Sequence, residues 1–296
     1  MTLIFFLAGG TEVSAQTVYA SFSGSSAETD ALYREMLSSV EGTISISADV
    51  WQQIRLFGQD YTAWGTYNEL EDRPESRGKG AVQFRLDLQV RSPADAKEVK
   101  SPNTLTIVRD HSFNFIYRYF VLEEEKRMER IDIKRLVEAI EKQGRNDLPT
   151  EAGSMFALGG LAGMLREMRN RYDFNTAPLK TQIQEKNNAV AVWRVRGRLK
   201  PEILAELTSD ASGKKTVVPR HMPTTIDISI GVNDRFPYRF DYYWMPDGSD
   251  PTAESFANLL FYNLELNSPG IVPSLFDYSP SEYIDITDKV IQRMLR

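Results

Sequence analysis

The amino-acid sequence predicts an α+β protein built on one strongly curved antiparallel sheet with helices covering its concave face. Segments in which apolar and polar residues alternate recur in two groups, about eleven in total, and such alternation is typical of strands. Short polar turns separate neighbouring segments, which favours antiparallel pairing. Helical segments lie between the two groups, and they must bury their apolar stripes against the sheet.

The N-terminal stretch "LIFFLAGGTEVSAQ" is typical of a secretory signal peptide. An apolar run from Leu3 to Ala8 precedes small residues, and Val13-Ser14-Ala15 fits a cleavage site before Gln16. We therefore expect a signal peptide over residues 1–15, a flexible segment over 16–27, a single domain over 28–296, and a periplasmic or secreted location. A disordered or strand-forming N-terminus is the alternative to the signal peptide.

The first group of predicted strands follows a helix. Leu32, Met36 and Leu37 have helical spacing, which predicts a helix over residues 28–40. Strand patterns then cover residues 43–51, the aromatic stretch "DYTAWGTYNEL", and "AVQFRLDLQV", in which every second residue is apolar. Three more strands are expected over residues 104–108, 113–120 and 125–131. Polar stretches such as "EDRPESRGKG" have the composition of turns.

Helices separate this group from the second one. "DIKRLVEAIEKQG" and "SMFALGGLAGMLREMRNRY" both predict helices, and Gly144 is a suitable end for the first. The second group begins with a hairpin in "LKTQIQEKNNAVAVWRVRGRLK". Residues 201–207 predict a short helix, "TTIDISIGV" and "YRFDYYWM" predict a hairpin, and "FANLLFYNLELNSP" predicts the last long strand. A helix is expected from about residue 285 to 295. Division into two domains near residue 150 would leave each half-sheet without a partner.

Composition excludes several function classes. The net charge of −6 and the pI of about 5.2 argue against nucleic-acid binding. With no cysteine, disulfides, thiol catalysis and thiolate metal sites are excluded. Only His111 and His221 could supply imidazole, too few for a histidine-rich zinc site, and no G-x-S-x-G motif occurs. We therefore predict no catalytic residue, no metal and no cofactor, although a carboxylate pair of the glycosidase type stays an alternative.

Two further patterns allow two interpretations each. Gly159, Gly160 and Gly163 match neither dinucleotide-binding nor P-loop spacing, so close helix packing is the favoured interpretation. Arg194, Arg196 and Arg198 form a basic row on one strand face. That row is either solvent-exposed or a patch for anionic headgroups or an acidic partner.

Apolar side chains that would line the concave space are the candidate site. Methionine suits a surface that repacks around varied apolar guests, so the helix over residues 154–168 could act as an adaptable lid over a cavity. The alternative is an ordinary filled core. The candidate ligand-binding residues are Phe84, Leu86, Leu88, Phe115, Tyr117, Met164, Trp193, Tyr242 and Trp244.

Three segments resemble the LolA/LppX-like family of envelope lipid and lipoprotein carriers. They are "NTLTIVRDHSFNFIYRYFVLEEEKRMERID", "RFPYRFDYYWMPDG" and "LFYNLELNSPGIVPSLFDYSPSEYIDITD", and the likeness in order and spacing covers roughly residues 30–296. The resemblance implies an incomplete β-barrel with helices on its concave face, so that residues 28–296 would form a single half-barrel domain. Family carriers also use an arginine near the cavity to latch a lid helix, a role that we assign to no residue here.

The function expected from this resemblance is non-enzymatic transport in the periplasm. Lipid or lipoprotein acyl chains would be the partners, a membrane-bound protein could serve for their release, and no nucleic acid is expected. One alternative is an envelope structural or protein-interaction module with the same fold and a filled core. Another is an enzyme with an unrecognised carboxylate site.

Overall fold

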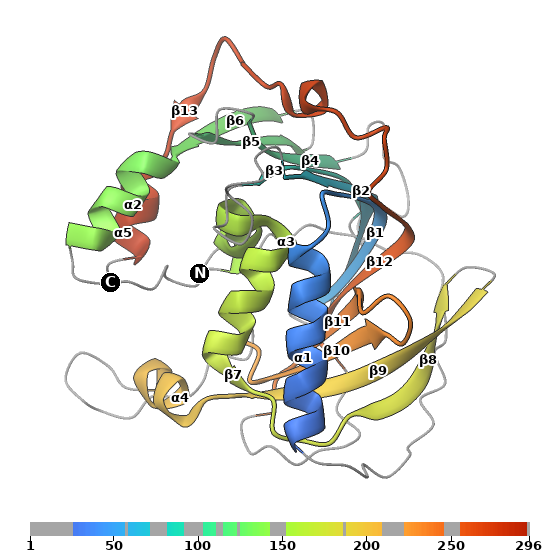
Figure 1. Ribbon diagram of the computed structural model, residues 1–296. Coiled ribbons are helices and arrows are strands. Elements are labelled where there is room, and N and C mark those ends of the chain that lie inside the picture. Colours follow the sequence, from blue (N-terminus) through green and yellow to red (C-terminus); the bar gives the residue numbers. More distant parts are fainter. Residues whose placement is uncertain are drawn as a thin grey trace.

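Figure 1 shows the computed structural model, which describes residues 26–56, 59–71, 82–91, 103–110, 115–122, 125–142, 152–185, 188–208, 222–245 and 255–294. In these ranges thirteen strands form one unclosed sheet, accompanied by five α-helices. The predicted α+β class with a curved, mostly antiparallel sheet is confirmed. The predicted signal peptide lies outside the described residues. Residues 26 and 27, expected to be flexible, already belong to the first helix.

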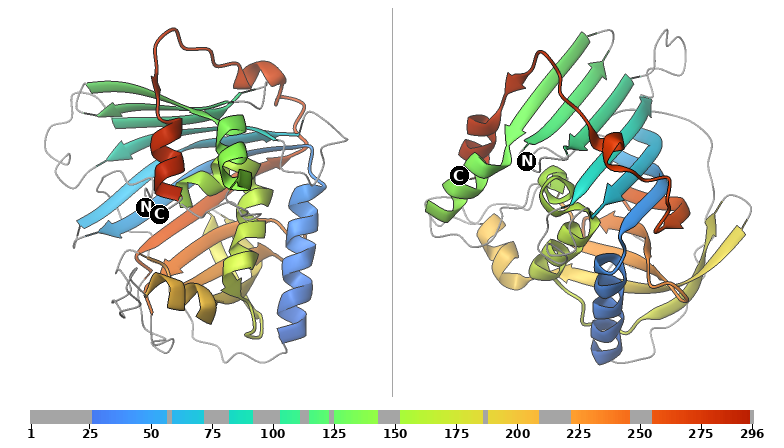
Figure 2. Two further views of the ribbon diagram at one scale, coloured as in Figure 1. Left: turned by 90° about the vertical axis from the view of Figure 1, so that its left-hand side faces the viewer. Right: turned by 45° about the horizontal axis from the view of Figure 1, so that its top comes forward.

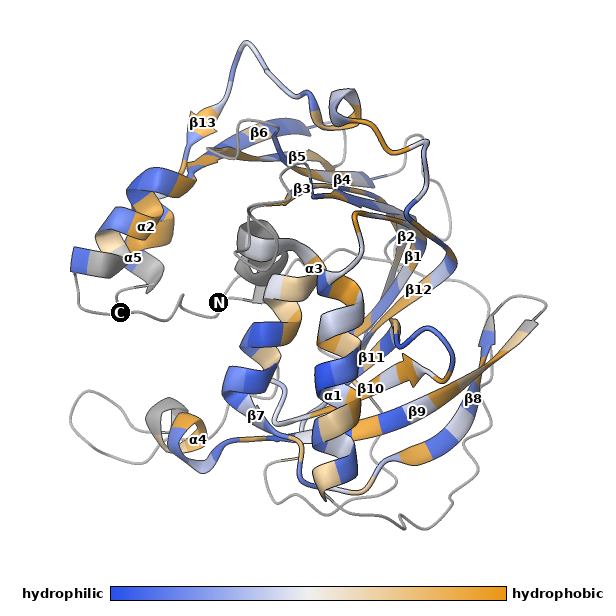
Figure 3. Ribbon diagram, viewed as in Figure 1, coloured by the Kyte–Doolittle hydropathy of each residue, from blue (hydrophilic) through white to orange (hydrophobic). Residues whose placement is uncertain are grey.

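The strands alternate in hydropathy along their length, as Figure 3 shows, because successive side chains point to opposite faces. They are β1 (Ser45–Leu56), β2 (Gln59–Leu70), β3 (Gln83–Arg91), β4 (Asn103–Arg109), β5 (Phe115–Leu122), β6 (Glu125–Asp132), β7 (Tyr172–Asp173), β8 (Leu179–Glu185), β9 (Asn188–Leu199), β10 (Thr225–Gly231), β11 (Pro237–Tyr243), β12 (Ala257–Leu266) and β13 (Ile284–Asp285).

The sheet joins the two sequence groups through its middle. Its order is β13-β6-β5-β4-β3-β2-β1-β12-β11-β10-β9-β7, and β8 also pairs with β9. Strand β12 pairs antiparallel with β1, so the last long strand of the chain lies beside the first. Every pairing is antiparallel except that of β13 with β6. Because adjacent twisted strands rotate relative to one another, so long a sheet curves and acquires a concave face.

The helices are α1 (Ser26–Glu41), α2 (Ile133–Lys142), α3 (Ala152–Arg171), α4 (Pro201–Leu207) and α5 (Thr287–Met294), with a short 3₁₀ turn, η3 (Pro273–Phe276). Helices α1 and α3 lie side by side against the concave face, which Figure 2 shows from two further directions. Helix α2 packs against α5 beyond the β6 edge of the sheet. The predicted helices are therefore present, and α1 and α3 supply the expected cover.

Candidate functional site

The concave face of the sheet forms a continuous apolar surface, which we call the concave wall. Strand register places its members on one face, since residues that pair across strands point the same way. Phe84 pairs with Glu69 on β2, Leu86 with Tyr67, and Phe240 with Leu259. The wall consists of Ile46, Val50, Tyr67, Phe84, Leu86, Leu88, Leu105, Ile107, Val195, Ile226, Ile228, Phe240, Leu259 and Phe261.

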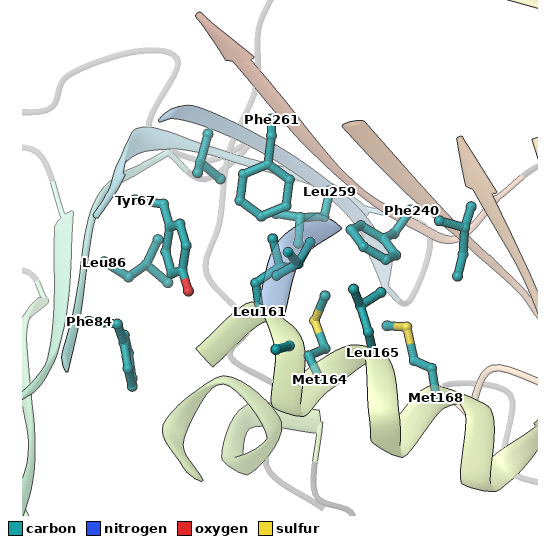
Figure 4. Close-up of a cluster of buried hydrophobic side chains, with 14 of the residues drawn as sticks. Tyr67, Phe84, Leu86, Leu161, Met164, Leu165, Met168, Phe240, Leu259 and Phe261 are labelled. Carbon is teal, nitrogen blue, oxygen red and sulfur yellow. The ribbon is translucent and has the colours of Figure 1, made fainter. Parts of the chain in front are cut away.

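Residues 161–171 of α3, which we call the cover, lie directly on this wall. Leu161, Met164, Leu165 and Met168 have the spacing of one helical face, and each is at most 2% exposed. Figure 4 shows these four side chains pointing toward Tyr67, Phe240, Leu259 and Phe261. Burying each such side chain contributes about 1.5–3 kcal/mol. The cover is therefore held mainly by apolar contact.

Helix α1 braces the cover from the side. The Tyr33 hydroxyl donates a hydrogen bond of 2.6 Å to the carbonyl oxygen of Leu165. Arg166 lies 2.6 Å from the Glu41 carboxylate, and Arg169 lies 2.5 Å from that of Asp30. These ion pairs are partly exposed and contribute little each. The buried Tyr33 contact is the more specific tie between the two helices.

Six of the nine predicted ligand-binding residues belong to this concave side. Phe84, Leu86 and Leu88 lie in the wall, and Met164 lies in the cover. Trp193 pairs with Ile230, and Tyr242 pairs with Ile226, so both face the same way as the wall. Both are half-buried against the core. Trp244 follows the end of β11, just beyond the last paired residue.

The prediction that Phe115 and Tyr117 line the concave face is wrong. Tyr117 pairs with Val108, which is out of phase with wall residues Leu105 and Ile107, so both aromatic residues lie on the convex face. On that face Tyr117 meets the C-terminal part of the chain, and Phe115 meets a side chain of β6. The Tyr117 ring lies 5.6 Å from that of Tyr278, and the Arg130 guanidinium lies 4.6 Å from the Phe115 ring. The sequence correctly predicted that alternate residues of β5 share a face, but it did not predict which of them lie on the same face as Phe84, Leu86 and Leu88 of β3.

One carboxyl group interrupts the apolar wall. Glu69 is buried on β2, and its Oε2 accepts a hydrogen bond of 2.8 Å from the Leu161 backbone N–H. The Tyr67 hydroxyl donates to the same oxygen. Arg109 lies on the other side of Phe84, because Phe84 pairs with both Glu69 and Arg109. The cover is thus tied to the wall by a polar contact as well as by apolar ones.

Burial dominates the electrostatics of this group. It raises the pKa of Glu69 from 4.5 to about 7, although the Leu161 N–H, the Tyr67 hydroxyl and the Arg109 charge each lower it. Burial likewise lowers the pKa of Arg109 to about 10, against the opposing effects of Asp110 and Glu69. Glu69 can therefore change its protonation state near neutral pH.

Helix α3 is broken where Glu69 meets it. Gly159 and Gly160 have non-helical backbone angles, and Gly160 has a φ of 59° and a ψ of −153°, a region that only glycine adopts readily. A Cβ at Gly160 would also collide with Glu69 and Val82. Leu161 is therefore the first residue of a new helical segment, and its N–H has no partner within the helix. The predicted close packing is observed at Gly160, but the break was not predicted.

A small pocket opens beside the break. Its volume is about 20 Å³, room for roughly one water molecule, and its lining includes Glu41, Glu69, Glu71, Gly159 and Arg166. It lies where the end of α1, the end of β2 and the cover meet. Glu69 therefore borders a space that water can occupy, despite its burial.

Glu69, Tyr67 and Arg109 were not among the predicted site residues. The sequence signal for such a residue is a charged side chain in a strand at a position where the alternation would place an apolar one. Arg109 follows Leu105 and Ile107 in this way. In β2 the alternation is less regular, so Glu69 was recognisable only from its strand register.

The predicted basic row is neither an open solvent face nor a free cationic patch. Arg196 forms two hydrogen bonds of 2.6 and 2.7 Å with Asp227, whose side chain is fully buried. Arg194 lies 3.9 Å from the same carboxylate. Arg198 is exposed. Asp227 on β10 thus neutralises much of the row.

Metal binding and membrane crossing are two further possibilities within the described ranges. No group of three or more histidine, cysteine, aspartate or glutamate side chains there could hold a metal ion. No helix of the described chain combines the length and the apolar character that a bilayer crossing requires. The predicted turn residue His111 and the loop residue His221 lie outside the described residues.

Comparison with known proteins gives likeness in structure alone. No family model matches the chain, and no curated protein matches it. LprF from Mycobacterium bovis is 11% identical, with a TM-score of 0.39 over 86% of this chain and 98% of its own. A DUF1329 family protein from Desulfovibrio piger is 13% identical, with a TM-score of 0.35 over 84% of this chain and 97% of its own.

A LolA superfamily protein from Nitrosomonas europaea is 9% identical, with a TM-score of 0.27 over 83% of this chain and 97% of its own. These identities and TM-scores are low, so the likeness concerns the fold alone. The structural neighbours of this chain thus include LolA-like folds.

Proposed function

We propose that this protein is a non-enzymatic carrier that shields acyl chains of lipids or lipoproteins against its concave wall. The observation that carries the proposal is the pairing of an extended apolar wall with a helical cover rich in leucine and methionine. The wall draws its side chains from strands β1 to β4 and β9 to β12. Such a surface suits long apolar guests that lack specific polar groups.

To bind, an acyl chain must replace the apolar contacts that the cover now makes with the concave wall. Each buried methylene contributes about 0.8 kcal/mol, so an acyl chain of some sixteen carbons would gain on the order of 10 kcal/mol. That gain is comparable with the burial of the four apolar cover residues. Met164 and Met168 can repack around a guest because their side chains are unbranched and flexible.

The location and partners belong to the same proposal. A signal peptide over residues 1–15 would deliver the chain to the periplasm as a single half-barrel domain of residues 28–296. Acyl chains would be received there and released to a membrane-bound partner. The net charge of −6 gives no support to nucleic acid as a partner.

A protein-interaction module is the second candidate, and the tight fit of the cover favours it. Leu161 and Leu165 are fully buried against the wall, and the pocket beside the break is water-sized. If the cover never leaves the wall, the concave side is an ordinary core. Function would then lie on the outer surface.

Photo-crosslinking with a diazirine-bearing fatty acid distinguishes the two candidates. We expect adducts, mapped by peptide mass spectrometry, on concave residues such as Leu86, Leu88 and Tyr242. The Met164→Gln variant should label several-fold more, because a buried amide weakens the hold of the cover that the acyl chain must displace. The Met128→Gln variant is the matched control, since Met128 pairs with Tyr119 on the convex side and should leave labelling unchanged. Adducts only on the convex face, or none at saturating probe, would contradict the carrier function.

A further inference from the structure

The contact between Glu69 and Leu161 combines three features that apolar packing does not require. A carboxyl group lies among wall residues, it accepts the first N–H of the helical segment, and the helix is broken by glycines at that point. An ordinary capping side chain accepts from the N–H of the second or third helical residue and leaves the first to water or to another part of the chain. Here a residue 92 positions away in the sequence accepts from this first N–H. We call the Glu69–Leu161 contact the clasp.

We propose that the clasp is a proton-linked switch: protonated Glu69 keeps the cover on the concave wall, and ionised Glu69 favours its release. Burial disfavours the charged form as long as the cover is in place. When the cover leaves, Glu69 meets water and ionises readily. The consequence for cargo rests on the proposed carrier function, whereas the clasp itself does not depend on it.

The charged and titratable groups around Glu69 come from every element packed against it. Tyr67 of β2 donates a hydrogen bond, and Arg109 of β4 lies across Phe84. Glu71, just beyond β2, adds a repulsive negative charge. Across the pocket, Glu41 of α1 and Arg166 of α3 neutralise each other in an ion pair. The desolvation of Glu69 outweighs the favourable contacts, which raises its pKa above the ordinary value.

The difference between the pKa of Glu69 in the closed state and in the open state sets the direction of the pH effect. The closed state binds the proton more tightly than the open state, so acid favours closure and rising pH favours opening. With a pKa of about 7 when closed and 4.5 when open, the ratio of open to closed protein should rise about 70-fold between pH 5 and pH 8. Most of the change falls between the two pKa values. The pocket gives water and protons access without unfolding.

Distance measurement between two spin labels tests the clasp without any lipid. The chain has no cysteine, so Asn170→Cys on the cover and Gln89→Cys on β3 would be the only labelling sites. Both residues are exposed. We expect a second, longer distance whose population grows from pH 5 to pH 8. In the Glu69→Gln background the short distance should persist at pH 8, because the amide still accepts the Leu161 N–H but cannot ionise.

Glu71→Gln is the matched control, since it removes the same charge from the same pocket. The pH response should remain but move to lower pH, because the repulsion that raises the pKa of Glu69 is lost. If Glu69→Gln does not fold, Tyr67→Phe replaces it. Loss of that hydrogen bond should move the opening to higher pH. A distance distribution that does not change with pH, or a pH response retained in Glu69→Gln, would overturn the proposal. Opening with pH but no fatty-acid labelling would support the clasp and reject the carrier.

Discussion

Gly160 is the residue on which the geometry of the cover most depends. Its backbone angles are those of glycine, and the space where a side chain would begin is already filled by Glu69 and Val82. The break therefore depends on glycine for two reasons: the backbone angles at this position, and the lack of space for a side chain. Any other residue would either strain the backbone or push Glu69 from the Leu161 N–H.

The substitution Gly160→Ala tests this dependence. We expect it to lower the free energy of unfolding by about 1–3 kcal/mol from backbone strain alone, with more from the collision. Chemical denaturation monitored by circular dichroism measures the change. Gly270→Ala is the control, because its added methyl group would meet nothing closer than 3.7 Å. Equal stability of the two variants would show that the break tolerates a side chain.

Single residues also show where sequence reasoning succeeds. Alternation in β3 correctly predicts that Phe84, Leu86 and Leu88 share a buried face, because the period of two is a property of one strand. The same reasoning fails for Phe115 and Tyr117. Their face depends on the register between β4 and β5, and a shift of one residue reverses every side chain.

At the scale of elements, an ion pair joins β9 and β10 on the convex face. Arg196 binds both carboxylate oxygens of Asp227, and Asp227 is fully buried. Loss of one partner from a buried pair leaves an uncompensated charge, which costs far more than loss of an exposed pair. The predicted basic row is thus part of the structural framework of the sheet.

The substitution Asp227→Asn should destabilise the protein by about 3–5 kcal/mol because Arg194 and Arg196 would lose their buried counter-charge. The control is Asp60→Asn, which removes the exposed partner of Arg55 and should cost about 0–1 kcal/mol. Urea denaturation of both variants at one pH provides the comparison. Similar losses in the two would mean that the buried pair is not a structural anchor.

The break in α3 could not be predicted from the pattern of the helix itself. Apolar periodicity continues through "GGLAGMLREM", so the pattern indicates one helix. The break arises from a contact with Glu69 on β2, far away in the sequence. A tertiary contact of this kind leaves no periodic signal. Only the run of glycines hinted at an irregularity.

At the scale of the whole molecule, the sheet order explains how one wall forms from two strand groups. Pairing of β12 with β1 joins them, and α1 and α3 then cover the resulting concave face. The sequence predicted the class, the groups and the covering helices from local patterns. The hairpins were also predicted, but the pairing of β12 with β1 was not predictable, since it depends on contacts between residues about 200 positions apart.

The molecule as a whole therefore presents an apolar wall beneath a cover that is tied down by one buried carboxyl group. Cargo transport requires that an acyl chain take the place of the cover residues on the wall. Glu69 supplies a means of biasing that exchange through proton binding. The wall, the cover and the clasp would together serve the binding and release of acyl chains.

Native mass spectrometry of the protein, purified from a bacterial host without detergent, is the decisive test of acyl-chain binding. We expect a bound acyl lipid at one-to-one stoichiometry, identified after extraction. We also expect delipidated protein to take up an added fluorescent fatty acid. A clean protein mass together with failure to take up the fatty acid would contradict acyl-chain binding and make the concave side an ordinary core.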